Sequence, residues 1–170
     1  MNFQSQSQGF TLVELVVTIM VVGIMAAVAM PRFADQQGFQ SRAFYEQVQE
    51  AIKFAQKAAV AQRKSVYVTT TTTTLKACYV AACSGVGSYA VIDPTTKAAL
   101  SLAAQDQRGV AFSAVTISPA TTFAFDSLGR PRSAANVLLT ATTTISVNST
   151  ATGDINRSII IEPETGYVHN

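Results

Sequence analysis

A single carboxylate, Glu14, lies inside a long apolar segment near the start of the chain. Between Leu12 and Met30 the only polar side chains are those of Glu14 and Thr18. A run of this length matches the hydrocarbon core of a bilayer, which is roughly 30 Å thick. An acidic group inside a membrane helix costs about 2.5 to 3.5 kcal/mol, so it is rarely found there without a partner. We therefore take Glu14 as a functional residue whose charge needs a partner.

Two arginines beside a tight turn form the second group with chemical content. After a short apolar stretch, Gly129 permits a tight turn, and Pro131 stiffens it and disfavours helix at Arg130. We expect Arg130 and Arg132 to be displayed on a short rigid loop, where two planar guanidinium groups suit phosphate oxygens. The net charge of the whole chain is only +2, so binding to a polyanion must be local.

The two cysteines, Cys78 and Cys83, are close neighbours in the sequence. If this part of the chain lies outside the cytoplasm, we expect them to form a small-loop disulfide at a strand end or hairpin. A metal site is disfavoured because two thiolates need further ligands and the only histidine, His169, is far away in the sequence. A six-residue ring gains little loop entropy, so the bond would shape the chain locally.

Enzymatic function has little support in the sequence. A serine or cysteine nucleophile would have to use His169, in a terminal segment that we expect to be mobile. Neither a phosphate-binding loop nor a dinucleotide-binding glycine pattern is present. The later acidic residues are scattered beside turns and lack the spacing of a calcium loop, which favours solvated loop caps. They include Asp93, Asp126, Asp154, Glu162 and Glu164. We therefore expect a protein that is not an enzyme and has neither metal nor cofactor.

These groups must be positioned by a long N-terminal helix and by strands that follow it. From Asp35 to Arg63, apolar side chains recur at spacings of three to five residues, with charged and amide side chains largely between them. Pro31 is the only strong interruption and is expected to kink the helix. We predict one helix from about Thr11 to Arg63 that packs on a sheet. Its apolar face comprises Phe39, Phe44, Val48, Ile52, Ala55 and Ala59.

After Ser65 the sequence changes to short β-branched runs separated by turn residues, a spacing that favours antiparallel meanders. The threonines of 69–74 are assigned to an exposed edge or loop. The predicted strands are Val66–Thr71, Leu75–Val80, Ser88–Ile92, Val110–Val115, Thr121–Asp126, Val137–Val147, Ile159–Glu162 and Tyr167–His169. The predicted fold is therefore α+β, a long N-terminal helix with a membrane-spanning first half, packed on an antiparallel β-sheet domain. Its parts are 10–34 for the membrane-spanning helix, 35–64 for the amphipathic continuation and 65–170 for the β-rich domain.

The stretch from Gly9 to Leu15, GFTLVEL, resembles the processing site of the type IV pilin and pseudopilin family. The resemblance implies that a prepilin peptidase cuts after Gly9, that residues 1–9 are a leader and that Phe10 becomes an N-methylated N-terminus. It also implies that Glu14 meets the terminal amine of a neighbouring pilin subunit in a filament. Pro31 falls where many pilins kink this helix.

Three other interpretations of this segment remain open. Glu14 could reach the cytoplasmic headgroups of the inner membrane lipid from one turn inside the helix. The segment could also be an ordinary stop-transfer anchor, or a secretory signal peptide cut at Ala27-Val28-Ala29. A signal peptide would have an unusually long apolar region and no basic region before it. The leader departs from the family pattern in lacking Lys and Arg, and Arg32 opposes the positive-inside bias.

The stretch from Phe123 to Arg132 resembles the Gly-Arg-x-Arg loop of FimT-type minor pilins, in which the arginines bind DNA during natural transformation. Strand, turn and basic residue are similar to the wider GspH/FimT domain family. The resemblance implies a non-specific site for double-stranded DNA at Gly129, Arg130 and Arg132.

A structural interpretation of the same stretch competes with DNA binding. Phe123 and Phe125 would be core residues, and the two arginines would be solvated or paired with Asp126. With two phosphate contacts alone, binding would be weak, and the logarithm of the affinity would fall with the logarithm of the salt concentration with a slope of about 2. Tight capture of DNA would need avidity from several subunits or help from Arg157 and Lys97.

Together the two resemblances predict a minor pilin or pseudopilin of a type IV pilus or type II secretion filament. It would be a single-pass inner-membrane protein with a periplasmic C-terminal domain, and periplasmic or extracellular once assembled. Glu14 and helix packing would serve assembly, and Arg130 and Arg132 would serve DNA uptake. The alternatives are a purely structural GspH-like pseudopilin without DNA binding and a generic membrane-anchored periplasmic domain.

Overall fold

The structure is a computed structural model of the 170-residue chain. It describes residues 10–34, 36–83, 89–105, 111, 113–151 and 153–170. Two compact units are distinguished, residues 1–36 and residues 37–170. Gly9 and the leader predicted at 1–9 lie outside the described residues.

The first unit contains α1, Leu12–Ala34. Thr11 caps its start, because the threonine hydroxyl accepts a hydrogen bond from the backbone N–H of Glu14 at 3.2 Å. Large apolar side chains are exposed along α1 from Leu12 to Val28. Among the described residues, no helix combines the length and the apolarity needed to cross a membrane. Pro31 lies within α1, and its kink stays a prediction.

The second unit is built around α2, Gln36–Gln62. Most of the predicted apolar face is buried, including Phe44, Val48 and Ile52. The prediction was wrong for Phe39, which is 77 % exposed. Phe39 precedes Phe44 by five residues, which is about 140° of rotation around a helix with 3.6 residues per turn. Its side chain therefore points away from the core.

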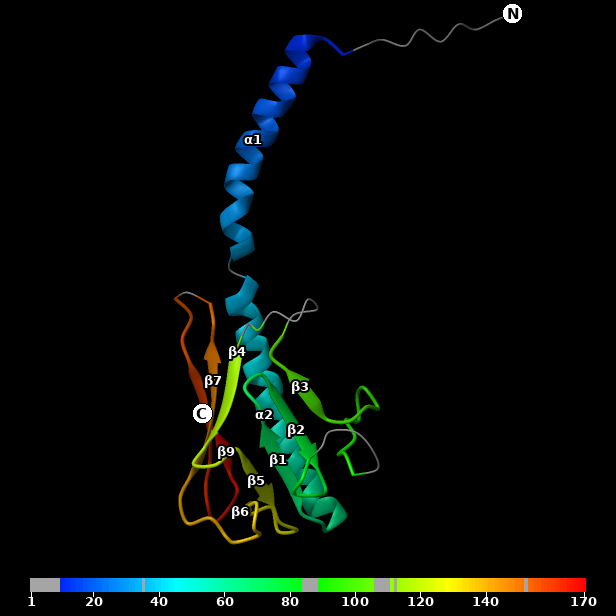
Figure 1. The fold of residues 1–170 in the computed structure, drawn as a ribbon, viewed down its shortest axis with the longest axis vertical. Helices are drawn as coiled ribbons and strands as arrows, with labels where there is room; N and C mark the ends of the chain where they lie inside the picture. The colour runs from blue at the N-terminus through cyan, green and yellow to red at the C-terminus, as the bar shows by residue number, and fades with distance from the viewer. Residues whose placement is uncertain (1–9, 35, 84–88, 106–110, 112, 152) are drawn as a thin grey trace, which may run out of the picture. The chain divides into compact units, whose positions relative to one another are not determined.

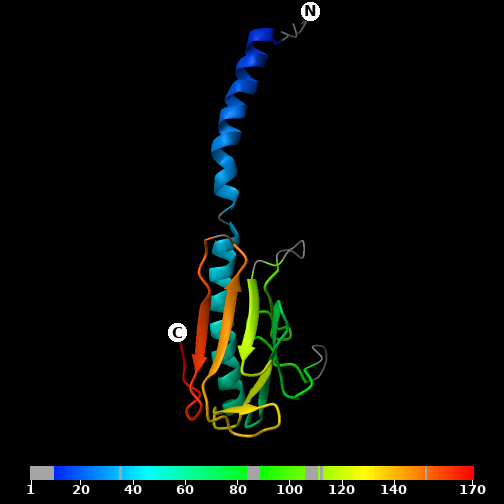
Figure 2. The same cartoon turned by 60° about the vertical axis from the view of Figure 1, so that its left-hand side comes forward.

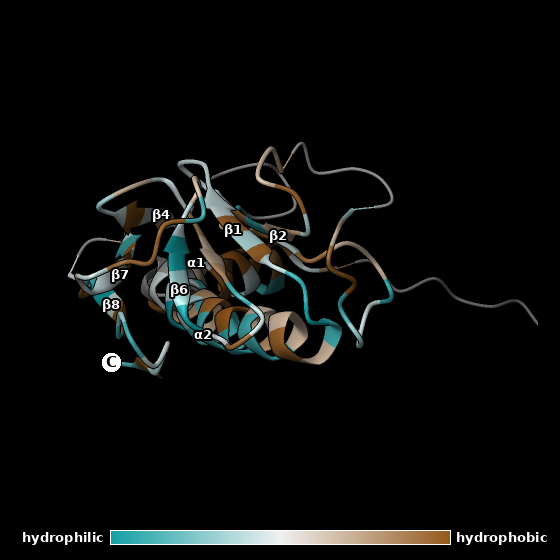
Figure 3. Ribbon diagram, turned by 90° about the horizontal axis from the view of Figure 1, so that it is seen from below, coloured by the Kyte–Doolittle hydropathy of each residue, from teal (hydrophilic) through white to brown (hydrophobic). Residues whose placement is uncertain are grey.

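Two antiparallel sheets pack against α2 (Figures 1 and 2). The first has the order β3 (Ser101–Ala103), β2 (Thr74–Cys78), β1 (Val66–Thr70), β5 (Thr122–Phe125) and β6 (Pro131–Ser133). The second has the order β4 (Ser113–Ser118), β7 (Thr143–Ser149), β8 (Arg157–Ile161) and β9 (Val168–His169). Figure 3 shows these strands arched over one side of α2. Phe123 and Phe125 of the first sheet and Ile145 and Ile159 of the second join α2 in one buried core.

Several strand predictions needed correction. β4 and β7 begin three and six residues later than predicted, and β3 and β6 were not predicted. Within the described part of 88–92, only isolated bridges form, at Ala90 and Ile92. Thr69 and Thr70 lie in β1, which pairs with both β2 and β5, and not at an edge. β6 contains a proline and two polar residues, so its strand conformation comes from pairing with β5 and not from local propensity.

Candidate functional site

Asp126 organises the turn that follows β5. Its side chain is buried, with only 6 % of the residue exposed. Its Oδ1 accepts hydrogen bonds from the backbone N–H groups of Leu128 and Arg130, both at 2.9 Å. The Asp126 carbonyl accepts a further bond from the N–H of Gly129 at 2.9 Å. Gly129 has φ +80°, a conformation that favours glycine, so the turn requires this residue.

The same carboxylate holds both predicted arginines. Asp126 Oδ2 lies 3.2 Å from Arg130 Nε, 3.1 Å from Arg130 Nη2 and 3.0 Å from Arg132 Nε. Arg132 Nη1 also donates to the carbonyl of Asn136 at 3.0 Å. Two expectations are thereby corrected: Arg132 lies in β6 and not in a loop, and Asp126 is not a solvated cap. The pairing with Asp126 that the structural interpretation required is present.

The charge of Asp126 is maintained by its surroundings. Burial raises the pKa of this carboxyl, but the backbone N–H of Arg130 and the Arg132 side chain, with further bonds from Leu128 and Arg130, lower it by more. The net pKa of Asp126 lies below its usual value. The carboxylate is therefore ionised at neutral pH, and both pairs with arginine are ion pairs.

A third arginine, missed by the sequence analysis, lies at the same place. Arg63 follows the end of α2 and lines a hollow of about 270 Å³ together with Arg130 and Arg132. Asp126 and several polar groups complete the lining. Three guanidinium groups against one carboxylate leave an excess of two positive charges. No sequence signal connects Arg63 to the later pair, because only the packing of α2 on the first sheet joins them.

The two residues proposed to assist DNA binding are not among those that line this hollow. Arg157 forms a bidentate ion pair with Asp154, with N–O distances of 2.9 and 3.3 Å, and its side chain is 12 % exposed. The Arg157 bonds hold the pKa of Asp154 far below its usual value. Lys97 lies in the turn after Asp93, to whose carbonyl its backbone N–H donates.

Gln56 ties the arginine turn to α2. Its Nε2 donates to the carbonyls of Gly129 and Gly166, both at 2.9 Å. These two glycines belong to turns far apart in the sequence, and both have positive φ, +80° and +67°. One amide side chain of the helix therefore fixes the turn after β5 against the turn before β9.

Phe10 lies just before α1, and Glu14 lies in the first turn of this helix. Phe10 is 80 % exposed and Glu14 is exposed as well. The Thr11 cap and the bond from the N–H of Leu15 to the Thr11 carbonyl at 3.2 Å begin the helix one residue after the cap. A carboxylate in a first helical turn also interacts favourably with the helix dipole.

The predicted disulfide is present. Cys78, at the end of β2, is bonded to Cys83, with a Cα–Cα distance of 5.6 Å. From the sequence, His169 was expected to lie in a mobile tail. It lies instead in β9, where its Nε2 is 3.0 Å from Glu162 Oε1. That bond is the main reason why the pKa of His169 is raised. Within the described ranges, no cluster of three or more His, Cys, Asp or Glu could hold a metal.

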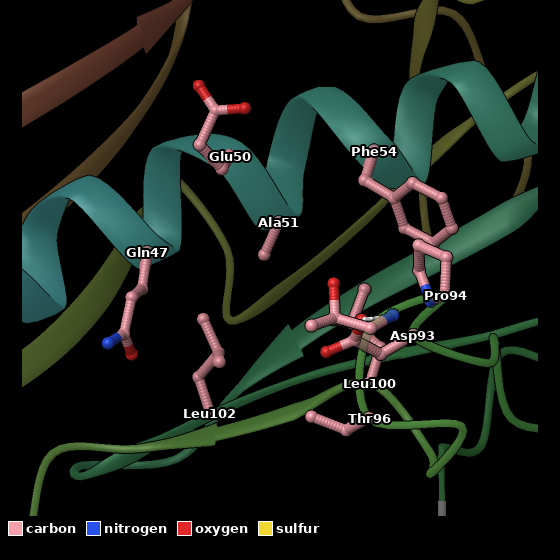
Figure 4. A pocket seen from close by; sticks show the side chains of 10 residues that line it. Gln47, Glu50, Ala51, Phe54, Asp93, Pro94, Thr96, Leu100 and Leu102 are labelled. Carbon is pink, nitrogen blue, oxygen red and sulfur yellow. Dashed lines mark hydrogen bonds between the residues drawn. The ribbon is translucent and has the colours of Figure 1, made fainter.

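A hollow of about 520 Å³ lies between α2 and residues 93–102 (Figure 4). Ala51, Phe54, Leu100 and Leu102 contribute apolar lining. The Asp93 carboxylate at its border accepts the N–H of Thr95 at 2.7 Å. The lining therefore combines apolar contact with polar groups at the border.

The chain matches a known protein family over most of α2 and over strands of both sheets. Residues 45–163, from α2 to just after β8, match the family described as Type II transport protein GspH. The chain belongs to the GspH family. Residues 4–30 separately match the prokaryotic N-terminal methylation motif. A GspH-type domain and a methylation motif in one chain identify a member of the type IV pilin and pseudopilin superfamily.

Curated relatives of this GspH-family chain are pilins. The chain is 34 % identical over 61 residues to the Type IV narrow pilus major component PilA5 of Thermus thermophilus, covering 36 % of this chain and 53 % of that protein. It is 49 % identical over 57 residues to the Type IV major pilin protein PilE1 of Neisseria gonorrhoeae, covering 32 % of this chain and 31 % of that protein. The chain thus spans about half or less of the length of these relatives.

Crystal structures of the type IV minor pilin FimU of Pseudomonas aeruginosa share the fold. One has a TM-score of 0.52 at 13 % identity and covers 75 % of this chain and 85 % of FimU. A second crystal form gives 0.52 at 12 %, covering 75 % and 90 %. The predicted α+β fold, a helix packed with antiparallel sheets, is thereby confirmed.

Proposed function

We propose that this GspH-family chain is a minor pilin or pseudopilin subunit of a type IV pilus or type II secretion filament. The observation that carries the proposal is the presence of the N-terminal methylation motif and the GspH-type domain in one chain. The exposed apolar side chains of α1 support it, because a surface of this kind requires cover by lipid or by neighbouring helices.

Assembly would use the first turn of α1. A prepilin peptidase removes the residues up to Gly9, and the amine of Phe10 becomes the methylated N-terminus. The Glu14 carboxylate of one subunit then pairs with the terminal amine of the next. Phe10 and Glu14 are four residues apart, which is about 6 Å along a helix, so this pairing requires neighbouring subunits to be offset along the helix axis. Mutual pairing also relieves the cost of placing either charge in an apolar layer.

Before assembly, the chain would be a single-pass protein of the inner membrane, held by the apolar segment Leu12–Met30. Its domain would lie in the periplasm. The disulfide Cys78–Cys83 supports this location, because such bonds persist in oxidising compartments.

The test is to analyse filaments sheared from cells that produce the chain. We expect the chain in the filament fraction, with an N-terminal peptide that begins at Phe10 and carries an added methyl group, as measured by mass spectrometry. A peptide that still contains residues 1–9 in the filament would contradict processing. A mature start at Met30 would restore the signal-peptide interpretation.

A second candidate function is DNA binding during natural transformation, and the hollow beside Asp126 favours it. Asp126 contacts the Nε side of both Arg130 and Arg132, which restricts the two guanidinium groups to one region, and Arg63 borders the same hollow. Restricted guanidinium groups lose less entropy when they bind a phosphate. Three phosphate contacts predict a salt slope of about 3 and weak, sequence-independent binding.

Removing Arg63 and Arg130 tests this second function. The double variant Arg63→Gln, Arg130→Gln keeps the ion pair between Asp126 and Arg132. We expect its DNA affinity to be about tenfold lower and less dependent on salt concentration than that of the wild type. Fluorescence titration of labelled duplex DNA with the full chain in detergent measures both. Lys97→Gln, a charge removed outside the hollow, is the matched control and should bind as the wild type does. Equal affinities of all three proteins, or no binding by the wild type, would leave filament assembly alone.

A further inference from the structure

One edge of the first sheet is open. β3 stands at the end of the strand order of this sheet and pairs with β2 on one side. Within the described ranges of the chain, no strand and no isolated bridge lies on its other side. Ser101 and Ala103 of β3 are exposed, so this edge is accessible. A strand edge of this kind presents backbone N–H and C=O groups that can pair with another chain.

The register shows which backbone groups of β3 face the open edge. Next to the strand, the N–H of Ala77 in β2 donates to the carbonyl of Leu100 at 3.1 Å. The backbone groups of successive strand residues point to opposite sides, so those of Leu102 also face β2. Those of Ser101 and Ala103 therefore face the open edge, where they can bond to a further strand.

The open edge adjoins the hollow of about 520 Å³. Leu102 lines this hollow together with Leu100 and with Ala51 and Phe54 of α2. Figure 4 shows Ala51 and Phe54 projecting from α2 on the side of the hollow that faces Leu100 and Leu102. Residues directly opposite each other on paired strands place their side chains on the same face of the sheet. A residue added opposite Leu102 therefore directs its side chain toward this apolar hollow.

The border of the hollow is acidic. Glu50 and Asp93 are among its lining residues, and no Lys or Arg is among the described residues that line it. The N–H of Thr95 is the main reason why the pKa of Asp93 is lowered, so this carboxylate is ionised at neutral pH. Glu50 is 74 % exposed, and its 3.4 Å ion pair with Lys53 is too exposed to hold it strongly. The border thus favours an occupant with a basic group beside its apolar one.

We propose that β3 and the adjoining hollow bind an extended segment of another protein, which adds to the open edge as an antiparallel strand. The segment carries an apolar residue and, two positions away on the same face, a basic residue. Its backbone bonds to Ser101 and Ala103, its apolar side chain enters the hollow beside Leu102, and its basic side chain meets the acidic border. The antiparallel direction follows the other strand pairs of this sheet.

Strand addition draws affinity from main-chain hydrogen bonds and specificity from pockets for alternate side chains, and both are present here. The site shares no residue with the N-terminal motif or with the arginine hollow. The inference therefore goes beyond filament assembly and DNA binding and does not depend on either.

Titration with a labelled synthetic peptide tests the site. The probe is Thr-Lys-Thr-Leu-Thr-Lys-Thr with blocked ends, which places Leu and both Lys on one face of a strand. We expect saturable binding to the full chain in detergent, measured by fluorescence anisotropy. Methylation of the backbone nitrogens of the two Thr that flank Leu removes the N–H groups directed at Ser101 and Ala103. This change should weaken binding about tenfold.

Methylation of the backbone nitrogen of Leu is the matched control for the peptide. In an antiparallel strand this N–H points away from β3, so its loss should change the affinity little. A larger loss from this control than from the two Thr methyl groups would show a different pairing and overturn the proposal. Absence of binding by the unmodified peptide would overturn it as well.

Variants of the chain locate the contact. Ala103→Pro removes an N–H that faces the open edge and keeps the bonds of Leu102 to β2, because edge strands tolerate proline. Peptide binding should become about tenfold weaker. Ala103→Val keeps this N–H and should bind as the wild type does. Asp93→Asn keeps an acceptor for the N–H of Thr95 but removes the charge, so binding should weaken about threefold and depend less on salt. Equal affinities of Ala103→Pro and the wild type would overturn the proposal.

A second copy of the chain is the competing occupant of this edge. Sedimentation of the full chain in detergent should give the same oligomeric state for the wild type and for Ala103→Pro. Oligomers that Ala103→Pro abolishes would show that a second copy pairs with β3 and would overturn the proposal. The methylated peptides test the same geometry without altering the protein, so the test holds even where Ala103→Pro fails to fold.

Discussion

Replacing Gly166 by alanine should destabilise the domain by about 3 to 5 kcal/mol, measured as the free energy of unfolding of the full chain in urea. Gly166 has φ +67°, where a residue with a side chain is strained by about 1 to 2 kcal/mol. A Cβ at this position would also overlap the carbonyl oxygen of Gly129 and lie 2.6 Å from Gln56 Nε2. Relief of that overlap requires the two turns to separate and breaks the bonds of Gln56.

Gly153→Ala is the matched control for this prediction. Gly153 also has positive φ, +84°, but a Cβ there would meet nothing within 4 Å. The control should therefore lose only the backbone strain of about 1 to 2 kcal/mol. Equal losses in the two variants would show that the close approach of Gly166 to Gly129 contributes nothing.

Replacing Glu14 by glutamine should remove the chain from filaments while leaving processing at Phe10 intact. Glutamine keeps the size of the side chain but cannot neutralise the terminal amine of a neighbouring subunit. Leaving one member of a buried ion pair without its partner costs about 3 to 5 kcal/mol, which is a hundredfold or more in incorporation. The measurement is the amount of chain in sheared filaments relative to the amount in the membrane fraction.

Thr18→Val supplies the control for the Glu14 variant. The Thr18 hydroxyl already donates to the Leu15 carbonyl at 2.8 Å within α1, so its removal should leave incorporation unchanged. Incorporation of the Glu14→Gln variant at the wild-type level would refute the pairing with a terminal amine and favour an interaction of Glu14 with lipid headgroups.

Local patterns were sufficient for many elements of the fold. The buried spacing of Phe44, Val48 and Ile52 follows from the helical period, and the strands β1 and β5 follow from runs of β-branched and aromatic residues. Phe39 was misplaced because an i, i+5 spacing was accepted as part of one helical face. β6 was missed because its conformation depends on pairing with β5.

By itself, the sequence determined the features that depend on neighbouring residues along the chain. The GFTLVEL motif, the exposed charges of α2 and the disulfide between Cys78 and Cys83 can all be inferred from short spacings. Only the tertiary structure decided which groups face the arginines. Asp126 is buried and forms ion pairs with Arg130 and Arg132. Arg63 lies beside them because packing of the core places the end of α2 next to the first sheet. Contacts of that kind join residues distant in sequence, and no local spacing encodes them.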